Sequence, residues 1–154
     1  MHSTPFDQLD DLLTRIHVAR QRPSWRRRLL ADADPVTSVS TLRTLRAVEH
    51  HQRNGAGASI GDVADYLAVE HSTASRTVSA VAAAGLITKS SAAEDQRRSV
   101  LVLTDIGVKA LAAVTDRRRE LVAETVADWD PADVDRLVAL LDRLTRRFEE
   151  AGCR

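Results

Sequence analysis

Residues 72–104, STASRTVSAVAAAGLITKSSAAEDQRRSVLVLT, constrain the fold more than any other stretch of the chain. Apolar residues recur at helical spacing up to Gly85, and glycine readily adopts the left-handed conformation that ends helices. Two β-prone segments, residues 86–88 and 100–103, then flank a polar tip over residues 89–99. This pattern predicts a helix that leads directly into a β-hairpin.

The predicted helix begins with short polar side chains and one arginine: Ser72, Thr73, Ser75, Arg76 and Thr77. Such side chains offer donors and acceptors to base edges and phosphates. The hairpin carries charged residues toward its tip, namely Lys89, Asp95, Arg97 and Arg98. Because arginines on a hairpin can enter a minor groove, the stretch predicts a winged helix that binds DNA.

Plainer interpretations exist for both groups of residues. The polar run is also typical of a solvated helix face with an N-cap, and Asp95 with Arg97 is also typical of a surface ion pair of little energetic value. For Lys89 and Arg98, a phosphate contact and a solvated charge look alike in a sequence. The hairpin beside the helix favours DNA contact.

A second helix is predicted just upstream. Ser59 followed three residues later by Asp62 resembles a capping box, which opens a short helix with an apolar inner face. A link of about four residues, 68–71, leads into the polar helix, which gives a helix-turn-helix arrangement. Ala64 supplies the small side chain that a close helix crossing requires.

The flanking regions are predicted to be helical. An amphipathic helix over residues 6–16 is expected to end near Pro23, and Ser38 is expected to open the next helix. A long helix is predicted after Thr104, with an apolar stripe of Ile106, Leu111, Val114, Leu121, Val122 and Val126. Asp130 is expected to cap the last helix, whose apolar residues from 134 to 148 form a coiled-coil-like seam. The expected fold is mainly α with a small β-hairpin wing.

Charge argues against strong general attraction to DNA. The chain of 154 residues carries 22 basic and 22 acidic residues, so its net charge is zero. Residues 1–58 have a net charge of +3, residues 59–104 of −1 and residues 105–154 of −2. The predicted binding module therefore depends on a few well-placed cations, which implies modest affinity for one copy and a need for two.

Several function classes are disfavoured. No apolar run approaches the roughly 20 residues that cross a bilayer, and the start of the chain is unlike a signal peptide. The single cysteine, Cys153, excludes an internal disulfide, so a cytoplasmic protein is expected. No nucleophile–base set, glycine-rich phosphate loop or cofactor motif is evident, so no enzyme is predicted.

Four groups of residues resemble the MarR family of bacterial transcriptional regulators, and the resemblance is densest over residues 59–111. They are Ser72-Thr73-Ala74-Ser75-Arg76-Thr77-Val78, Gly85-Leu86-Ile87, Asp95-Gln96-Arg97-Arg98 and Leu103-Thr104-Asp105-Ile106-Gly107. The resemblance implies a homodimer that binds a pseudo-palindromic operator in double-stranded DNA. It divides the single domain, residues 1–154, into a winged helix-turn-helix over 38–104 and dimerisation helices over 1–34 and 105–154.

The resemblance also implies residue roles. Ser72, Thr73, Ser75 and Arg76 would contact the major groove and phosphates. Arg97 would enter the minor groove, and Asp95 would fix its guanidinium through a charge-assisted hydrogen bond.

A repressor released by a small-molecule effector is the expected function. The alternative is a winged-helix protein-interaction module without DNA binding, which the neutral net charge favours. Trp25, His50 and His51 are weak candidates for effector binding. A zinc site at the two histidines lacks cysteine ligands and is not predicted. The arginine clusters 26–28 and 117–119 are interpreted as solvated faces or interface ion pairs.

Overall fold

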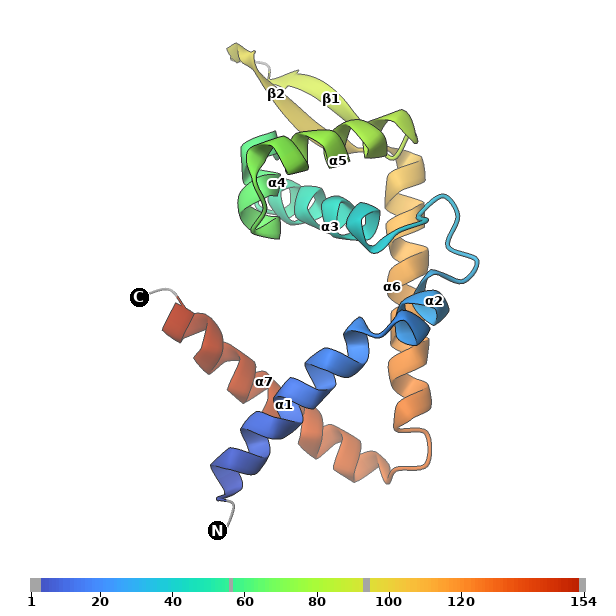
Figure 1. The fold of residues 1–154 in the computed structure, drawn as a ribbon, viewed down its shortest axis with the longest axis vertical. Coiled ribbons are helices and arrows are strands. Elements are labelled where there is room, and N and C mark those ends of the chain that lie inside the picture. Colours follow the sequence, from blue (N-terminus) through green and yellow to red (C-terminus); the bar gives the residue numbers. More distant parts are fainter. Residues whose placement is uncertain (1–3, 56, 93–94, 153–154) are drawn as a thin grey trace. The chain divides into compact units, whose positions relative to one another are not determined.

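The computed structural model describes residues 4–55, 57–92 and 95–152, and side chains there except over 91–99. In this part of the chain, seven helices and one two-stranded sheet confirm the mainly α fold with a small hairpin (Figure 1). The chain divides into two compact units, Met1–Arg117 and Arg118–Arg154. The elements are α1 (Pro5–Gln21), α2 (Pro23–Leu30), α3 (Val39–Arg53), α4 (Ile60–Leu67), α5 (His71–Ala83), β1 (Ile87–Ala92), β2 (Asp95–Leu103), α6 (Asp105–Thr125) and α7 (Pro131–Gly152).

The first two helices meet at Arg22, which is the C-cap of α1 and the N-cap of α2. Pro23 ends the first helix as expected, but it also occupies the first position of a second helix that the sequence analysis did not predict. The reason is that proline has a preset φ and needs no backbone donor in a first helical turn. The arginine-dense segment is therefore helical.

Predicted N-caps are present at the helices that build the binding module. The Thr41 backbone N–H donates to Ser38 Oγ (3.1 Å) at the start of α3. At α4, the Asp62 N–H donates to Ser59 Oγ (3.1 Å), and the Ser59 N–H donates to Asp62 Oδ2 (2.8 Å). These reciprocal bonds form the predicted capping box, which satisfies amide groups that lack partners within the helix.

Helices α3, α4 and α5 pack around one apolar core. Its buried side chains come from all three helices and include Leu42, Leu45, Val48, Val63, Leu67, Val78 and Val81. Ala64 is also buried, in agreement with its expected position at the helix crossing. The turn between α4 and α5 passes through Ala68, which has a left-handed backbone (φ 54°) and closes the helix with its amide bonded to Asp65 O.

The hairpin is longer than predicted. Strands β1 and β2 are antiparallel, with Ile87 opposite Leu103 and Lys89 opposite Leu101, and a register shift occurs at Ser91/Ala92. The residues expected as an irregular polar tip therefore continue the strand ladder, because backbone pairing does not require apolar side chains. The start of the hairpin follows Gly85, which has the predicted positive φ (75°).

The start of α6 lies close against the α5–β1 turn. Thr104 Oγ1 accepts the Gly107 N–H (3.0 Å) and donates to Gly85 O (2.6 Å). A Cβ atom at Gly107 would collide with the backbone carbonyl of Leu86, so only glycine fits this approach. Thr104 therefore caps α6 and also holds the helix against the hairpin.

The predicted apolar stripe of α6 is only partly buried. Leu111, Val114 and Leu121 are buried, whereas Ile106 and Val122 are exposed by 58% and 49%. Asp130 caps α7 as predicted, since its Oδ1 accepts the Ala132 N–H (2.8 Å). Among the described residues, none of the helices is long and apolar enough to cross a membrane.

Candidate nucleic-acid interface

Helix α5 has one buried face and one exposed face. Ala74, Val78 and Val81 are buried at spacings of four and three residues, which is one side of a helix. The opposite side presents Ser72, Thr73 and Arg76, all exposed. The polar run of the sequence is thus held outward by the core on which its helix packs.

Two other predicted contact residues lie at the edge of this face. Ser75 and Thr77 are half-buried, and Thr77 Oγ1 donates to Thr73 O (3.0 Å) within the helix. The Thr77 hydroxyl proton is therefore already used, so its oxygen serves an external ligand only as an acceptor. Ser72, Thr73 and Arg76 are the more accessible donors.

The amino end of α5 adds favourable electrostatics for an anion. The helix starts at His71, has no acidic residue in its first turn and has no side-chain cap from Glu70. Backbone N–H groups at a helix start lack intrahelical partners and carry partial positive charge. Phosphate groups bind well at such positions.

The hairpin is joined to α5 through a short, hydrogen-bonded turn. In this turn the Gly85 N–H donates to Ala82 O (2.9 Å) and the Leu86 N–H donates to Val81 O (3.2 Å). Lys89 on β1 is exposed. Asp95, Arg97 and Arg98 belong to β2 by their backbone, but their side chains lie outside the described part of the structure.

Two further contacts fix β2 to the end of α3 and to the segment that follows this helix. The Leu103 N–H donates to Gln52 Oε1 (3.0 Å), and the Leu101 N–H donates to Ala58 O (2.7 Å) in an isolated β-bridge. Gly57 lies directly against Val100 with a positive φ (65°), and a Cβ there would collide with the valine side chain. No local signal marks Gln52, whose partner is 51 positions away.

The weaker candidates do not converge on one site. His50 lies at the end of α3 beside Tyr66 of α4, with 5.3 Å between ring centroids, and contacts His51 edge to face. Trp25 is half-buried on α2. Within the described ranges, no three His, Cys, Asp or Glu side chains are grouped to hold a metal ion.

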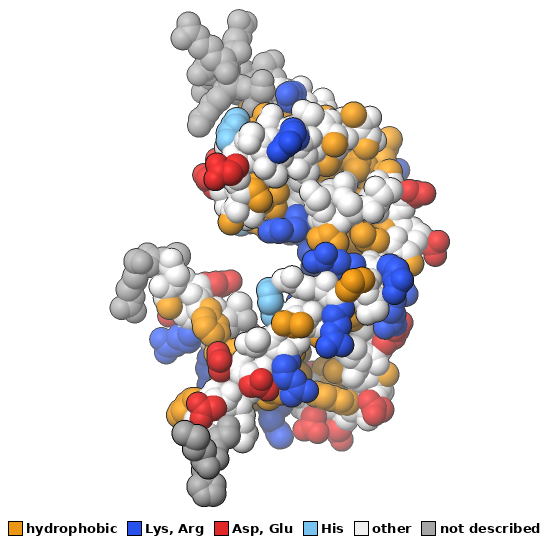
Figure 2. Space-filling model, in the orientation of Figure 1, with side chains coloured by type: hydrophobic (Ala, Val, Ile, Leu, Met, Phe, Trp, Pro, Cys, Tyr) orange, Lys and Arg blue, Asp and Glu red, His pale blue; other side chains and the backbone are white. Residues whose placement is uncertain are grey.

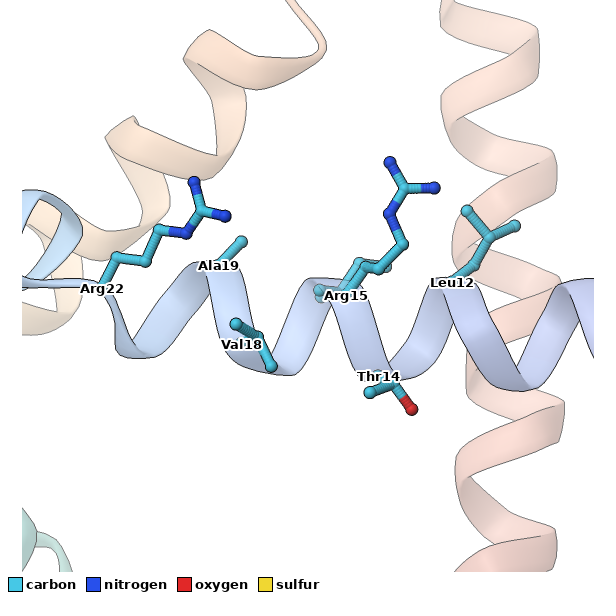
Figure 3. A pocket seen from close by; sticks show the side chains of 7 residues that line it. Leu12, Thr14, Arg15, Val18, Ala19 and Arg22 are labelled. Carbon is cyan, nitrogen blue, oxygen red and sulfur yellow. The ribbon is translucent and has the colours of Figure 1, made fainter.

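A shallow hollow of about 480 Å³ runs along α1. Figure 3 shows Arg15 and Arg22 pointing to the same side of the helix there, with Ala19 between them. None of the effector candidates is among its described lining residues, which are Leu12, Thr14, Arg15, Ile16, Val18, Ala19 and Arg22.

The comparisons with known proteins agree with this geometry. Residues 36–98, from the segment before α3 to the second strand of the hairpin, match the model of the MarR family. This segment belongs to the MarR family. Among curated proteins, none matches the chain.

Solved MarR-like structures are similar over nearly the whole chain. Rv1404 from Mycobacterium tuberculosis is 24% identical (TM-score 0.73, 96% of this chain and 97% of that one). The transcriptional regulator Tm0710 from Thermotoga maritima is 19% identical (TM-score 0.72, 96% and 98%). MepR from S. aureus, in a complex with DNA, is 20% identical (TM-score 0.60, 96% and 99%). The family model confirms the predicted family over residues 36–98, and the solved structures confirm the winged-helix fold.

Proposed function

We propose that the chain is a sequence-specific transcriptional regulator that binds double-stranded DNA as a homodimer. The observation that carries this proposal is the exposed polar face of α5, held outward by a buried apolar face and joined directly to a hairpin. Ser72, Thr73, Ser75 and Arg76 contact major-groove edges and phosphates, and Thr77 contributes as an acceptor. The DNA-bound state of a structurally similar MepR supports this role.

The hairpin makes the second set of contacts. Arg97 enters the minor groove beside the recognition helix, and Asp95 orients its guanidinium. Lys89 and Arg98 contact phosphates, which add affinity without sequence information. In this arrangement, the recognition helix of each copy contacts the major groove and its hairpin contacts the minor groove.

Dimerisation uses the terminal helices. Helix α1 exposes Phe6, Leu9, Leu12 and Ile16, with 42–80% of each residue accessible. Helix α7 exposes Leu137, Leu141 and Phe148 at intervals of four and seven residues, which place them on one side of the helix. Apolar stripes of this kind are stable in water when a partner covers them.

Regulation follows from the distance between the two recognition helices of the dimer. A dimer can occupy two half-sites only when its recognition helices are about one DNA turn apart. A small molecule that binds more tightly to a different spacing shifts the population away from the DNA-bound form. The protein acts as a cytoplasmic repressor that such an effector releases.

Selection of bound sequences from a random duplex pool tests the proposal. We expect an inverted repeat, and Arg76→Ala and Arg97→Ala should each weaken binding to it by about 1–3 kcal/mol. Arg136→Ala, which removes an exposed arginine of α7, is the matched control and should bind normally. Recovery of no preferred sequence would refute the assignment.

One observation favours a second function. The chain has zero net charge and its module, residues 59–104, has a net charge of −1, which suits a winged-helix protein-interaction module. Titration of random duplex DNA at several salt concentrations separates the two functions. A regulator shows affinity that falls steeply with salt, whereas an interaction module shows almost no binding.

A further inference from the structure

The strongest concentration of positive charge lies outside the winged helix. Residues 15–28 contain six arginines, and no acidic residue occurs between Asp11 and Asp32. The stretch covers the end of α1 and most of α2, and Figure 2 shows blue side chains gathered where these two helices meet. A chain of zero net charge thus holds one strongly basic surface.

Four of these arginines have no neutralising contact with the part of the chain that the structure describes. Arg20, Arg22, Arg26 and Arg27 are exposed, and none forms an ion pair or a side-chain hydrogen bond with the described residues. We call this group the arginine patch. Arg15 is not part of this patch, because it forms an ion pair with Asp11 (3.6 Å).

In α7, by contrast, three of the four arginines have an acidic partner. Arg136, Arg146 and Arg147 each pair with an acid three or four residues away, at 3.5, 2.9 and 3.5 Å. Local neutralisation is therefore available to arginines elsewhere in this chain. The patch instead places like charges side by side, with Arg22 and Arg26 four residues apart, a spacing that destabilises an isolated helix.

Helix dipoles offset this charge only in part, because Arg20 and Arg27 lie in the last turns of α1 and α2, where a cation is favoured. Arg22 is both the C-cap of α1, where a cation is favourable, and the N-cap of α2, where a cation is unfavourable. The first turn of α2 contains no acidic residue. An external anion would relieve this accumulated charge.

We infer that the arginine patch is a second, sequence-independent DNA-binding surface, which contacts the phosphate backbone. The inference rests on the proposed DNA-binding function. Guanidinium groups bind phosphate oxygens through paired hydrogen bonds, and they keep their charge at every physiological pH. Since the module itself has a net charge of −1, the patch supplies the general attraction to DNA that the module lacks.

Binding of the full-length protein to a random duplex, measured over a series of KCl concentrations, tests this inference. The triple variant Arg22→Gln, Arg26→Gln and Arg27→Gln should lower the slope of log affinity against log salt by about 2–3, because each lost phosphate contact removes roughly 0.9. At about 100 mM salt, affinity should fall at least tenfold.

The matched control removes the same charge from α7, through Arg136→Gln, Arg146→Gln and Arg147→Gln. Its salt slope should equal that of the unmodified chain. Equal losses in both variants would show an effect of net charge alone and would overturn the inference, as would an unchanged slope in the patch variant.

Two further measurements separate this inference from the proposed function. The patch variant should lose affinity equally for selected and random duplexes, because phosphates carry no sequence information. If the unmodified protein shows no preference for any sequence, the proposed function fails while the patch still binds DNA. Competition by polyglutamate that equals competition by DNA at the same charge would instead assign the patch to an acidic protein.

Discussion

The winged-helix segment and the terminal helices use their apolar residues in opposite ways. In α3, α4 and α5, residues such as Leu45, Val63 and Val78 are inaccessible to solvent. In α1 and α7, residues of the same type such as Phe6 and Phe148 remain exposed by 80% and 61%. The binding module thus buries its apolar residues within its own core, whereas those of the terminal helices stay accessible and would be covered by the partner in the proposed dimer.

The largest effect is expected from a cavity in the core of the module. Leu45→Ala should reduce the free energy of unfolding by about 2–5 kcal/mol, because Leu45 is fully buried and its neighbours cannot fill the space. Urea denaturation should show this loss at every protein concentration. A loss that disappears at high concentration would mean that the module depends on the partner for its core.

A charge on the apolar face of α7 should act differently. Leu141→Glu is expected to weaken the dimer about tenfold or more, since a buried, unpaired carboxylate opposes association. Sedimentation at micromolar concentration should show a shift from dimer to monomer. The neighbouring exchange Asp142→Glu, which keeps the charge, should leave the dimer intact, and an unchanged mass for Leu141→Glu would contradict the assigned seam.

The wing should behave as part of the module. Gln52→Ala removes the acceptor for the Leu103 N–H and should cost roughly 1–3 kcal/mol, the typical penalty for an unsatisfied amide. Hydrogen exchange at Leu103 should become faster. Gln21→Ala, which removes an exposed contact with His17, should leave that amide unaffected.

The smallest expected effect concerns the start of α1. Hydrogen bonds from the Thr4 backbone and side chain hold the pKa of Asp7 below its ordinary value. The charged carboxylate therefore stabilises the helix start above the ordinary pKa of an aspartate, and this stabilisation is lost as pH falls through the lowered value. Helicity should decrease in acid, and the decrease should be smaller for Asp7→Asn. Identical acid profiles would show that the capping box contributes nothing.

Much of the fold could be predicted because its signals are local. Ser38, Ser59 and Asp130 each cap a helix at the predicted residue, and Gly85 adopts the predicted left-handed backbone. These residues act on backbone groups within a few positions, so their effect can be inferred from spacing alone. The outward polar face of α5 follows in the same way from helical periodicity.

The features that were missed depend on position or on distant partners. Pro23 ends one helix and begins another, and only the end of the first helix was predicted. The contacts of Gln52 and Gly57 with the hairpin join residues far apart in the chain, where no periodicity applies. The arginines of the patch could be counted in the sequence, but only the folded chain shows that they have no neutralising partner among the described residues.

Native mass spectrometry of the protein bound to its selected duplex tests most directly whether exposed terminal helices join two binding modules on one DNA. We predict two chains on one duplex that contains both half-sites, and an intact two-chain species without DNA. A complex with one chain on that duplex, at protein concentrations that saturate it, would contradict the central claim.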